Sequence, residues 1–130
     1  MSKARPLIAI VDDEESIRRA LSRLLRASGL ENRTFPSGID FLESLNESHF
    51  DCVVLDIHMP RLGGFEVQAS LARANARIPV IVITGRDSDE TREQVMAAGA
   101  VAYLRKPIED RVLLSALATA LADEPDTDNR

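Results

Sequence analysis

The chain has 130 residues, of which 45% are hydrophobic and 28% are charged, and its formal net charge is −5. This length suits one globular domain, and a chain with a single cysteine, Cys52, forms no internal disulfide. The longest apolar runs, such as residues 7–11, have about five residues, which is too short for a helix that spans a membrane. No secretory signal is recognised, so we expect a cytoplasmic protein without membrane contact. The negative charge disfavours direct nucleic acid contact by this domain.

Five segments are predicted to be β-strands. The first, third and fourth are apolar without alternation, which is typical of strands covered on both faces. The second is the weakest of the five. In chain order the predicted strands are residues 7–11, 31–35, 52–55, 80–83 and 101–104.

The segments between these strands have helical spacing. In the first of them Ile17, Leu21, Leu24 and Leu25 share one face, and Gly29 follows as a probable C-cap. Further helices are predicted at residues 37–47, 65–74, 88–98 and 109–121.

Strand and helix therefore alternate five times along the chain. This order predicts an α/β fold with a parallel sheet between two layers of helices. Five such units fit a flavodoxin-like (βα)5 fold with strand order 2-1-3-4-5, whose ligand crevice opens at the carboxyl ends of the first and third strands. We expect the domain to span residues 1–122 and residues 123–130 to form a polar tail or linker stub.

Acidic residues follow the first and third predicted strands. Asp12 and Asp13 stand where a nucleotide-binding fold would have a glycine-rich loop, and Asp56 ends the third strand. Two unit charges about 4 Å apart repel by roughly 4 kcal/mol at an effective dielectric near 20. Such a cluster indicates a hard cation such as Mg²⁺. Helix capping by the first two acids and a surface position for Asp56 are the alternatives.

Thr84 and Lys106 follow the fourth and fifth predicted strands. Either alone is unremarkable, because a threonine often caps a turn and most lysines are solvated. Beside a carboxylate cluster, however, they suit phosphoryl transfer. A carboxylate attacks phosphorus in that reaction, and the metal, hydroxyl and ammonium contact the phosphoryl oxygens.

The sequence resembles the response-regulator receiver domains of two-component signalling, in the CheY-like superfamily, from about Leu7 to Leu121. Two of its motifs, at residues 59–60 and 98–100, favour the FixJ-like receivers. The motifs that carry the resemblance are Val11-Asp12-Asp13-Glu14, Leu55-Asp56-Ile57-His58-Met59-Pro60, Gly63-Gly64, Val82-Ile83-Thr84-Gly85, Ala97-Ala98-Gly99-Ala100 and Tyr103-Leu104-Arg105-Lys106-Pro107.

The resemblance implies a role for each residue of the acidic crevice. Asp56 matches the phosphoacceptor, Asp13 a direct Mg²⁺ ligand, and Asp12 a partner of the metal through water. His58 stands where the family uses the backbone carbonyl as a metal ligand. We expect its imidazole to face solvent or the phosphoryl group.

The resemblance also assigns the residues after the last two strands. Thr84 and Lys106 match the pair that binds the phosphoryl group. Thr84 and Tyr103 match the residues of the conformational switch. A cis peptide bond is expected between Lys106 and Pro107.

A receiver domain accepts a phosphoryl group from a sensor histidine kinase or a phosphotransfer protein. By resemblance, this chain is expected to catalyse its own phosphorylation on Asp56 and its slow dephosphorylation. Phosphorylation would change the surface formed by residues 88–98, 101–104 and 109–121 and so control an output domain or partner. Homodimerisation through this surface is one such expected contact. The chain would then be a signalling module and not a metabolic enzyme.

Two alternatives from other functional classes stay open. A Mg²⁺-dependent phosphatase of the haloacid-dehalogenase type also forms an aspartyl phosphate, but such enzymes have a second aspartate where this chain has His58. The second alternative is a receiver-like module that binds partners without phosphorylation. The presence of Asp12, Asp13 and Lys106 argues against it.

Overall fold

The computed structural model describes residues 5–74 and 76–122, and the predicted tail at residues 123–130 lies outside them. Within the described residues, five strands alternate with five helices, and none of these helices has the length and apolar character needed to cross a membrane. The strands are β1 (Leu7–Val11), β2 (Glu31–Phe35), β3 (Cys52–Asp56), β4 (Val80–Thr84) and β5 (Ala102–Arg105). The helices are α1 (Glu15–Ala27), α2 (Gly38–Ser44), α3 (Gly64–Arg73), α4 (Asp89–Ala97) and α5 (Asp110–Ala122).

The strands form one parallel sheet with the order β2-β1-β3-β4-β5, which confirms the predicted topology. β1 pairs with β2 on one side and with β3 on the other, so that Val11 lies opposite both Phe35 and Leu55. Neighbouring parallel strands end at the same edge of the sheet. The residues that follow β1 and end β3 are therefore brought together.

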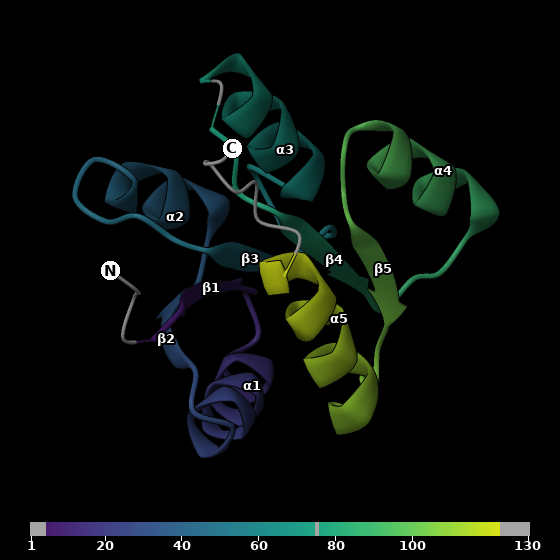
Figure 1. Cartoon of the computed structure of the whole chain (residues 1–130). Helices are drawn as coiled ribbons and strands as arrows, with labels where there is room; N and C mark the ends of the chain where they lie inside the picture. The colour runs from purple at the N-terminus through teal and green to yellow at the C-terminus, as the bar shows by residue number, and fades with distance from the viewer. Residues whose placement is uncertain (1–4, 75, 123–130) are drawn as a thin grey trace.

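Helices cover both faces of the sheet, with α1 and α5 on one face and α2, α3 and α4 on the other (Figure 1). Successive side chains of a strand point to opposite faces. In β1, Ile8 and Ile10 pack in the layer that contains Leu25 of α1, whereas Ala9 and Val11 pack in the opposite layer. All four of these β1 residues are fully buried, which explains why the strand is apolar without alternation.

The observed bounds differ from the predicted ones mainly at α2 and at the strand ends. α2 begins after Ser37, whose side chain accepts a hydrogen bond from the Asp40 amide at 3.1 Å. It ends at Ser44 instead of residue 47, because the next three amides bond to carbonyls three residues back, as in a 3₁₀ turn. β3, β4 and β5 each end one residue later than predicted. Asp56 and Thr84 are consequently held by the sheet itself.

The glycine pair at the start of α3 allows a close backbone approach. A Cβ atom on Gly64 would lie 2.7 Å from Cα of Ile57 and 2.9 Å from the carbonyl oxygen of Asp56. The amide of Gly64 also donates to the carbonyl of Ile57 at 3.1 Å. The start of α3 is therefore packed directly on the backbone that follows β3.

We expect the Cys52 thiol to be unreactive in the folded protein. Cys52 is fully buried within β3, and burial raises its pKa to about 12, so almost no thiolate exists at mildly alkaline pH. Ellman's reagent should label no thiol in the native chain and one thiol per chain in denaturant. Rapid labelling of the native protein would contradict this burial.

Candidate functional site

Three carboxylates meet at the carboxyl ends of β1 and β3. Asp12 is fully buried, Asp56 is 3% exposed, and Asp13 is exposed. One carboxylate oxygen from each lies within 4.8 Å of the other two. The predicted cluster is thus present, and the pairing of β1 with β3 creates it.

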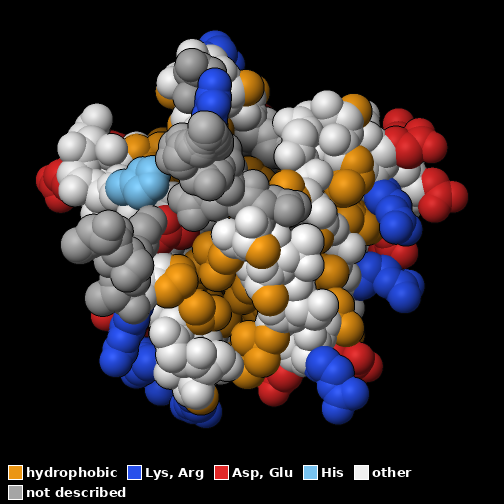
Figure 2. All heavy atoms as spheres, in the orientation of Figure 1, with side chains coloured by type: hydrophobic (Ala, Val, Ile, Leu, Met, Phe, Trp, Pro, Cys, Tyr) orange, Lys and Arg blue, Asp and Glu red, His pale blue; other side chains and the backbone are white. Residues whose placement is uncertain are grey.

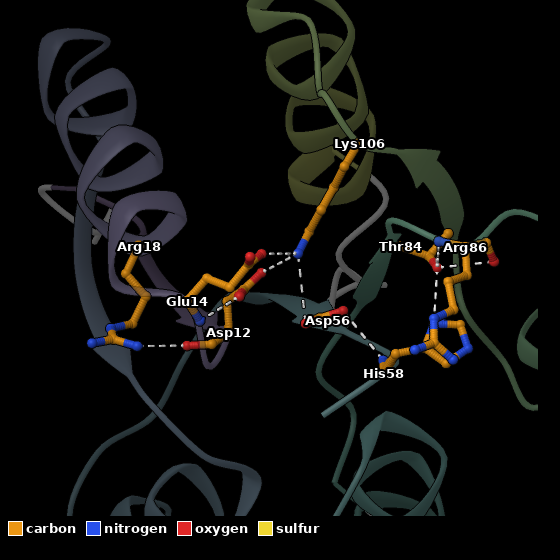
Figure 3. A network of polar contacts seen from close by, with 8 residues as sticks. All are labelled: Asp12, Glu14, Arg18, Asp56, His58, Thr84, Arg86 and Lys106. Atoms are coloured by element: carbon orange, nitrogen blue, oxygen red, sulfur yellow. Dashed lines mark hydrogen bonds and ion pairs between the residues drawn. The ribbon is translucent and has the colours of Figure 1, made fainter. Parts of the chain in front are cut away.

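Lys106 extends from the end of β5 into this cluster (Figure 3). Its ammonium nitrogen lies 3.0 Å from Oδ2 of Asp12, 3.6 Å from Oδ2 of Asp56 and 3.1 Å from Oε1 of Glu14. Burial disfavours the charged ammonium, but these carboxylates outweigh burial and raise the pKa of Lys106. The peptide bond between Lys106 and Pro107 is cis, as expected. The contact with Glu14 was not predicted.

The electrostatics of the cluster act most strongly on Asp56. Burial raises the pKa of its carboxyl group, the charge of Asp12 raises it further, and Lys106 and the His58 amide oppose them, with a result of about 6. The His58 amide donates to Oδ1 of Asp56 at 3.2 Å. One ammonium therefore does not fully offset the combined effect of burial and the neighbouring carboxylates on Asp56.

The cluster fits a hard divalent cation. Oδ2 of Asp12 is buried and makes no hydrogen bond with the described residues, although it forms the ion pair with Lys106. Carboxylate oxygens are the ligands that Mg²⁺ prefers, and it binds with few of them and several retained waters. Asp12, Asp13 and Asp56 supply such a donor set with one exposed side.

Thr84 ends β4 with its side chain fully buried. Its Oγ1 accepts a hydrogen bond from the Arg86 amide at 2.9 Å, lies 3.2 Å from the Arg86 carbonyl oxygen and lies 3.0 Å from Nδ1 of His58 (Figure 3). The residue His58 is exposed, as expected, but the hydrogen bond of its ring to Thr84 was not predicted.

Tyr103 lies on β5 with its hydroxyl directed to the loop between β4 and α4. The hydroxyl donates to Oδ1 of Asp87 at 2.8 Å, and Oδ2 of Asp87 lies 3.5 Å from Nη1 of Arg105. The guanidinium of Arg92 lies 5.9 Å from the centre of the tyrosine ring. Sequence reasoning missed Asp87. Its acidic side chain three residues after Thr84 is the only signal that the sequence offers.

Replacing Asp56 with asparagine is expected to stabilise the protein at neutral pH when no Mg²⁺ is present. The folded pKa of about 6 lies above the ordinary value of 3.8, so the contribution of this group to stability falls as pH rises from about 4 to about 6. The asparagine variant does not lose this stability as pH rises, and the difference in free energy of unfolding is expected to be about 1–3 kcal/mol. Urea unfolding at several pH values measures it.

The matched control for this experiment is Glu47→Gln, which removes an exposed carboxylate outside the cluster. We expect its pH dependence to follow that of the wild type. If Asp56→Asn and wild type had the same free energy of unfolding at every pH, the ionised Asp56 carboxylate would not destabilise the folded state, which would contradict this prediction.

The model of one protein family, the response regulator receiver domain, matches residues 8–118. Nodulation protein W of Bradyrhizobium diazoefficiens is 38% identical over 119 residues, which are 92% of this chain and 52% of that protein. The response regulator protein TmoT of Ectopseudomonas mendocina is 35% identical over 96% of this chain and 57% of its own length. The chain thus spans about half the length of these relatives.

Solved structures give the same result. Chemotaxis protein CheY4 of Vibrio cholerae has a TM-score of 0.84 and 31% identity, over 91% of this chain and 100% of that one. The structure of FixJ-N has a TM-score of 0.85 and 33% identity, over 94% and 96% of the two chains. Because both kinds of receiver match equally well, the FixJ-like assignment stays a prediction. The family itself is clear from sequence and fold alike, and the chain belongs to the response-regulator receiver domains.

Proposed function

We propose that this domain is a phosphorylation switch in which Asp56 accepts a phosphoryl group from the phosphohistidine of a sensor histidine kinase or phosphotransfer protein. The observation that carries the proposal is the Asp56 carboxylate, which ends β3 beside the Lys106 ammonium at 3.6 Å and within the cluster that fits a divalent cation. Because the donor is phosphorylated at the expense of ATP, we place the exchange in the cytoplasm.

In the forward step, a carboxylate oxygen of Asp56 attacks phosphorus while the phosphorus–nitrogen bond to the donor histidine breaks. The electron pair of that bond returns to the imidazole nitrogen, which takes a proton from solvent. In the slow dephosphorylation step, the oxygen of a water molecule attacks phosphorus while the bond to the Asp56 oxygen breaks. Asp56 leaves as a carboxylate, inorganic phosphate is released, and the proton of the water passes to solvent. The domain thereby catalyses part of both steps.

Different residues around Asp56 contact different oxygens of the phosphoryl group. The Lys106 ammonium neutralises one of them, and the Thr84 hydroxyl donates a hydrogen bond to another. Mg²⁺, when held by Asp13, Asp56 and the His58 carbonyl, with Asp12 acting through water, supplies the remaining positive charge.

The surface of α4, β5 and α5 is the proposed output face. A groove of about 810 Å³ opens there beside Tyr103. Acidic side chains gather over α4 at the right of Figure 2, where Asp89, Glu90 and Glu93 are exposed. We propose that phosphorylation changes this face to promote homodimerisation or contact with an output domain.

The test is phosphorylation by acetyl phosphate with and without Mg²⁺, followed on a phosphate-affinity gel. We expect one acid-labile phosphate on the wild type, none on Asp56→Asn, and a higher Mg²⁺ requirement for Asp13→Ala because Mg²⁺ relies on few carboxylates. Asp40→Asn, an exposed acid on α2, is the matched control and should behave as wild type.

The same gel, together with an assay of the inorganic phosphate released, separates the alternatives. A phosphatase of the haloacid-dehalogenase type would release inorganic phosphate from acetyl phosphate in many turnovers. A module that binds partners without phosphorylation would incorporate no phosphate at all. If wild type and Asp56→Asn incorporated equal amounts of phosphate, the acceptor would be a residue other than Asp56.

We also expect activation to raise the fluorescence of Tyr103. It is the one tyrosine in a chain without tryptophan, and its hydroxyl donates to the Asp87 carboxylate, a contact that quenches phenol emission. If Tyr103 rotates inward after phosphorylation, this contact is lost. Adding Mg²⁺ with beryllofluoride, a phosphoryl mimic, should therefore increase the emission.

Asp87→Ala is the matched variant for this measurement. It should start from the higher emission and change less on adding beryllofluoride. Unchanged emission of a wild-type protein that demonstrably binds beryllofluoride would show that Tyr103 keeps its contact with Asp87.

A further inference from the structure

The hydroxyl of Thr84 is fully engaged. A threonine hydroxyl has one proton to donate and two lone pairs. The Arg86 amide occupies one lone pair at 2.9 Å. The hydroxyl proton is donated to the Arg86 carbonyl oxygen at 3.2 Å. The Nδ1 atom of His58 lies 3.0 Å from the same hydroxyl oxygen and occupies its remaining hydrogen-bonding position. The hydroxyl can turn toward a phosphoryl oxygen only when these contacts are given up.

The contacts of Thr84 differ in where they come from. Arg86 lies two residues after Thr84, in the loop that follows β4, so its contacts are local to the end of β4. His58 is 26 residues away, on the loop between β3 and α3, and its ring ties that loop to the end of β4. The ring is thus the side-chain contact that fixes the Thr84 hydroxyl relative to the segment after β3.

His58 also contacts Asp56 through its backbone amide at 3.2 Å. Figure 3 shows this arrangement, with the amide of His58 toward Asp56 and the ring toward Thr84. One residue therefore touches both the carboxylate that would be phosphorylated and the hydroxyl that would bind the phosphoryl group.

We propose that His58 is a positioning residue whose imidazole, through its hydrogen bond to Thr84, holds the hydroxyl away from the phosphoryl position and so favours the unphosphorylated conformation of the domain. This inference rests on the proposed function, since it concerns the state that follows phosphorylation of Asp56. It assigns the histidine side chain an inhibitory effect on activation.

The experiment measures the affinity for beryllofluoride at saturating Mg²⁺ by fluorine NMR, which counts the bound mimic directly. His58→Ala frees the hydroxyl of Thr84 from one contact and should tighten binding about two- to tenfold, the range expected for one net hydrogen bond. His58→Phe keeps a ring but has no nitrogen, and should also bind more tightly than wild type.

Two controls separate this role from a general effect on the fold. His49→Ala, the same change at an exposed residue before β3, should leave the affinity unchanged. In a Thr84→Ala background the gain from His58→Ala should disappear, because the hydroxyl that the ring holds is absent.

The outcomes distinguish the inference from the proposed function. Absence of Mg²⁺-dependent beryllofluoride binding by the wild type would contradict the proposed function. Wild-type binding with equal or weaker binding by His58→Ala would contradict the inference alone. A gain that persists without the Thr84 hydroxyl would also contradict it, as would a His58→Phe variant that binds like wild type.

Discussion

The site depends on the repulsion between two buried carboxylates that the sheet forces together. β1 and β3 are neighbours and parallel, so Asp12 and Asp56 cannot separate without breaking the sheet. Lys106 enters from β5 and offsets part of this repulsion, with 14% of its side chain exposed. The fold thus maintains an excess of negative charge that suits a bound cation. Rigid strands make this arrangement possible, because flexible loops would let the charges move apart.

Polar contacts around the crevice form two separate groups. On one side Lys106 joins the acids that follow β1 to Asp56. On the other side His58 and Arg86 hold Thr84. Asp56 lies between these groups, and through its contacts with Lys106 and the His58 amide it touches both. A change in its charge therefore acts on the carboxylate balance and on the loop before α4 at the same time.

The sequence was sufficient for the features that depend on strand ends. Apolar runs define the strands, strand order follows from the alternation with helices, and the acids, Thr84 and Lys106 then meet at one edge. Contacts between loops were not predictable in this way. The bond from His58 to Thr84 and the bond from Tyr103 to Asp87 depend on side-chain rotamers across 26 and 16 residues of chain. The end of α2 was also misplaced, since its last turn tightens for local reasons that the apolar pattern does not encode.

The position of β5 at the edge of the sheet has a consequence for stability within the molecule. β5 pairs with β4 alone, its residues are at most half-buried, and α4 beside it buries only Val95 among its described residues. β3, by contrast, is paired on both sides and fully buried. Little apolar area must be exposed to shift α4, so this corner has a low free energy of local opening, whereas the strand that carries Asp56 opens only with the whole domain. The molecule accordingly holds the Asp56 carboxylate in its most cooperative part, and α4 and β5 lie in a part that can rearrange at small free-energy cost.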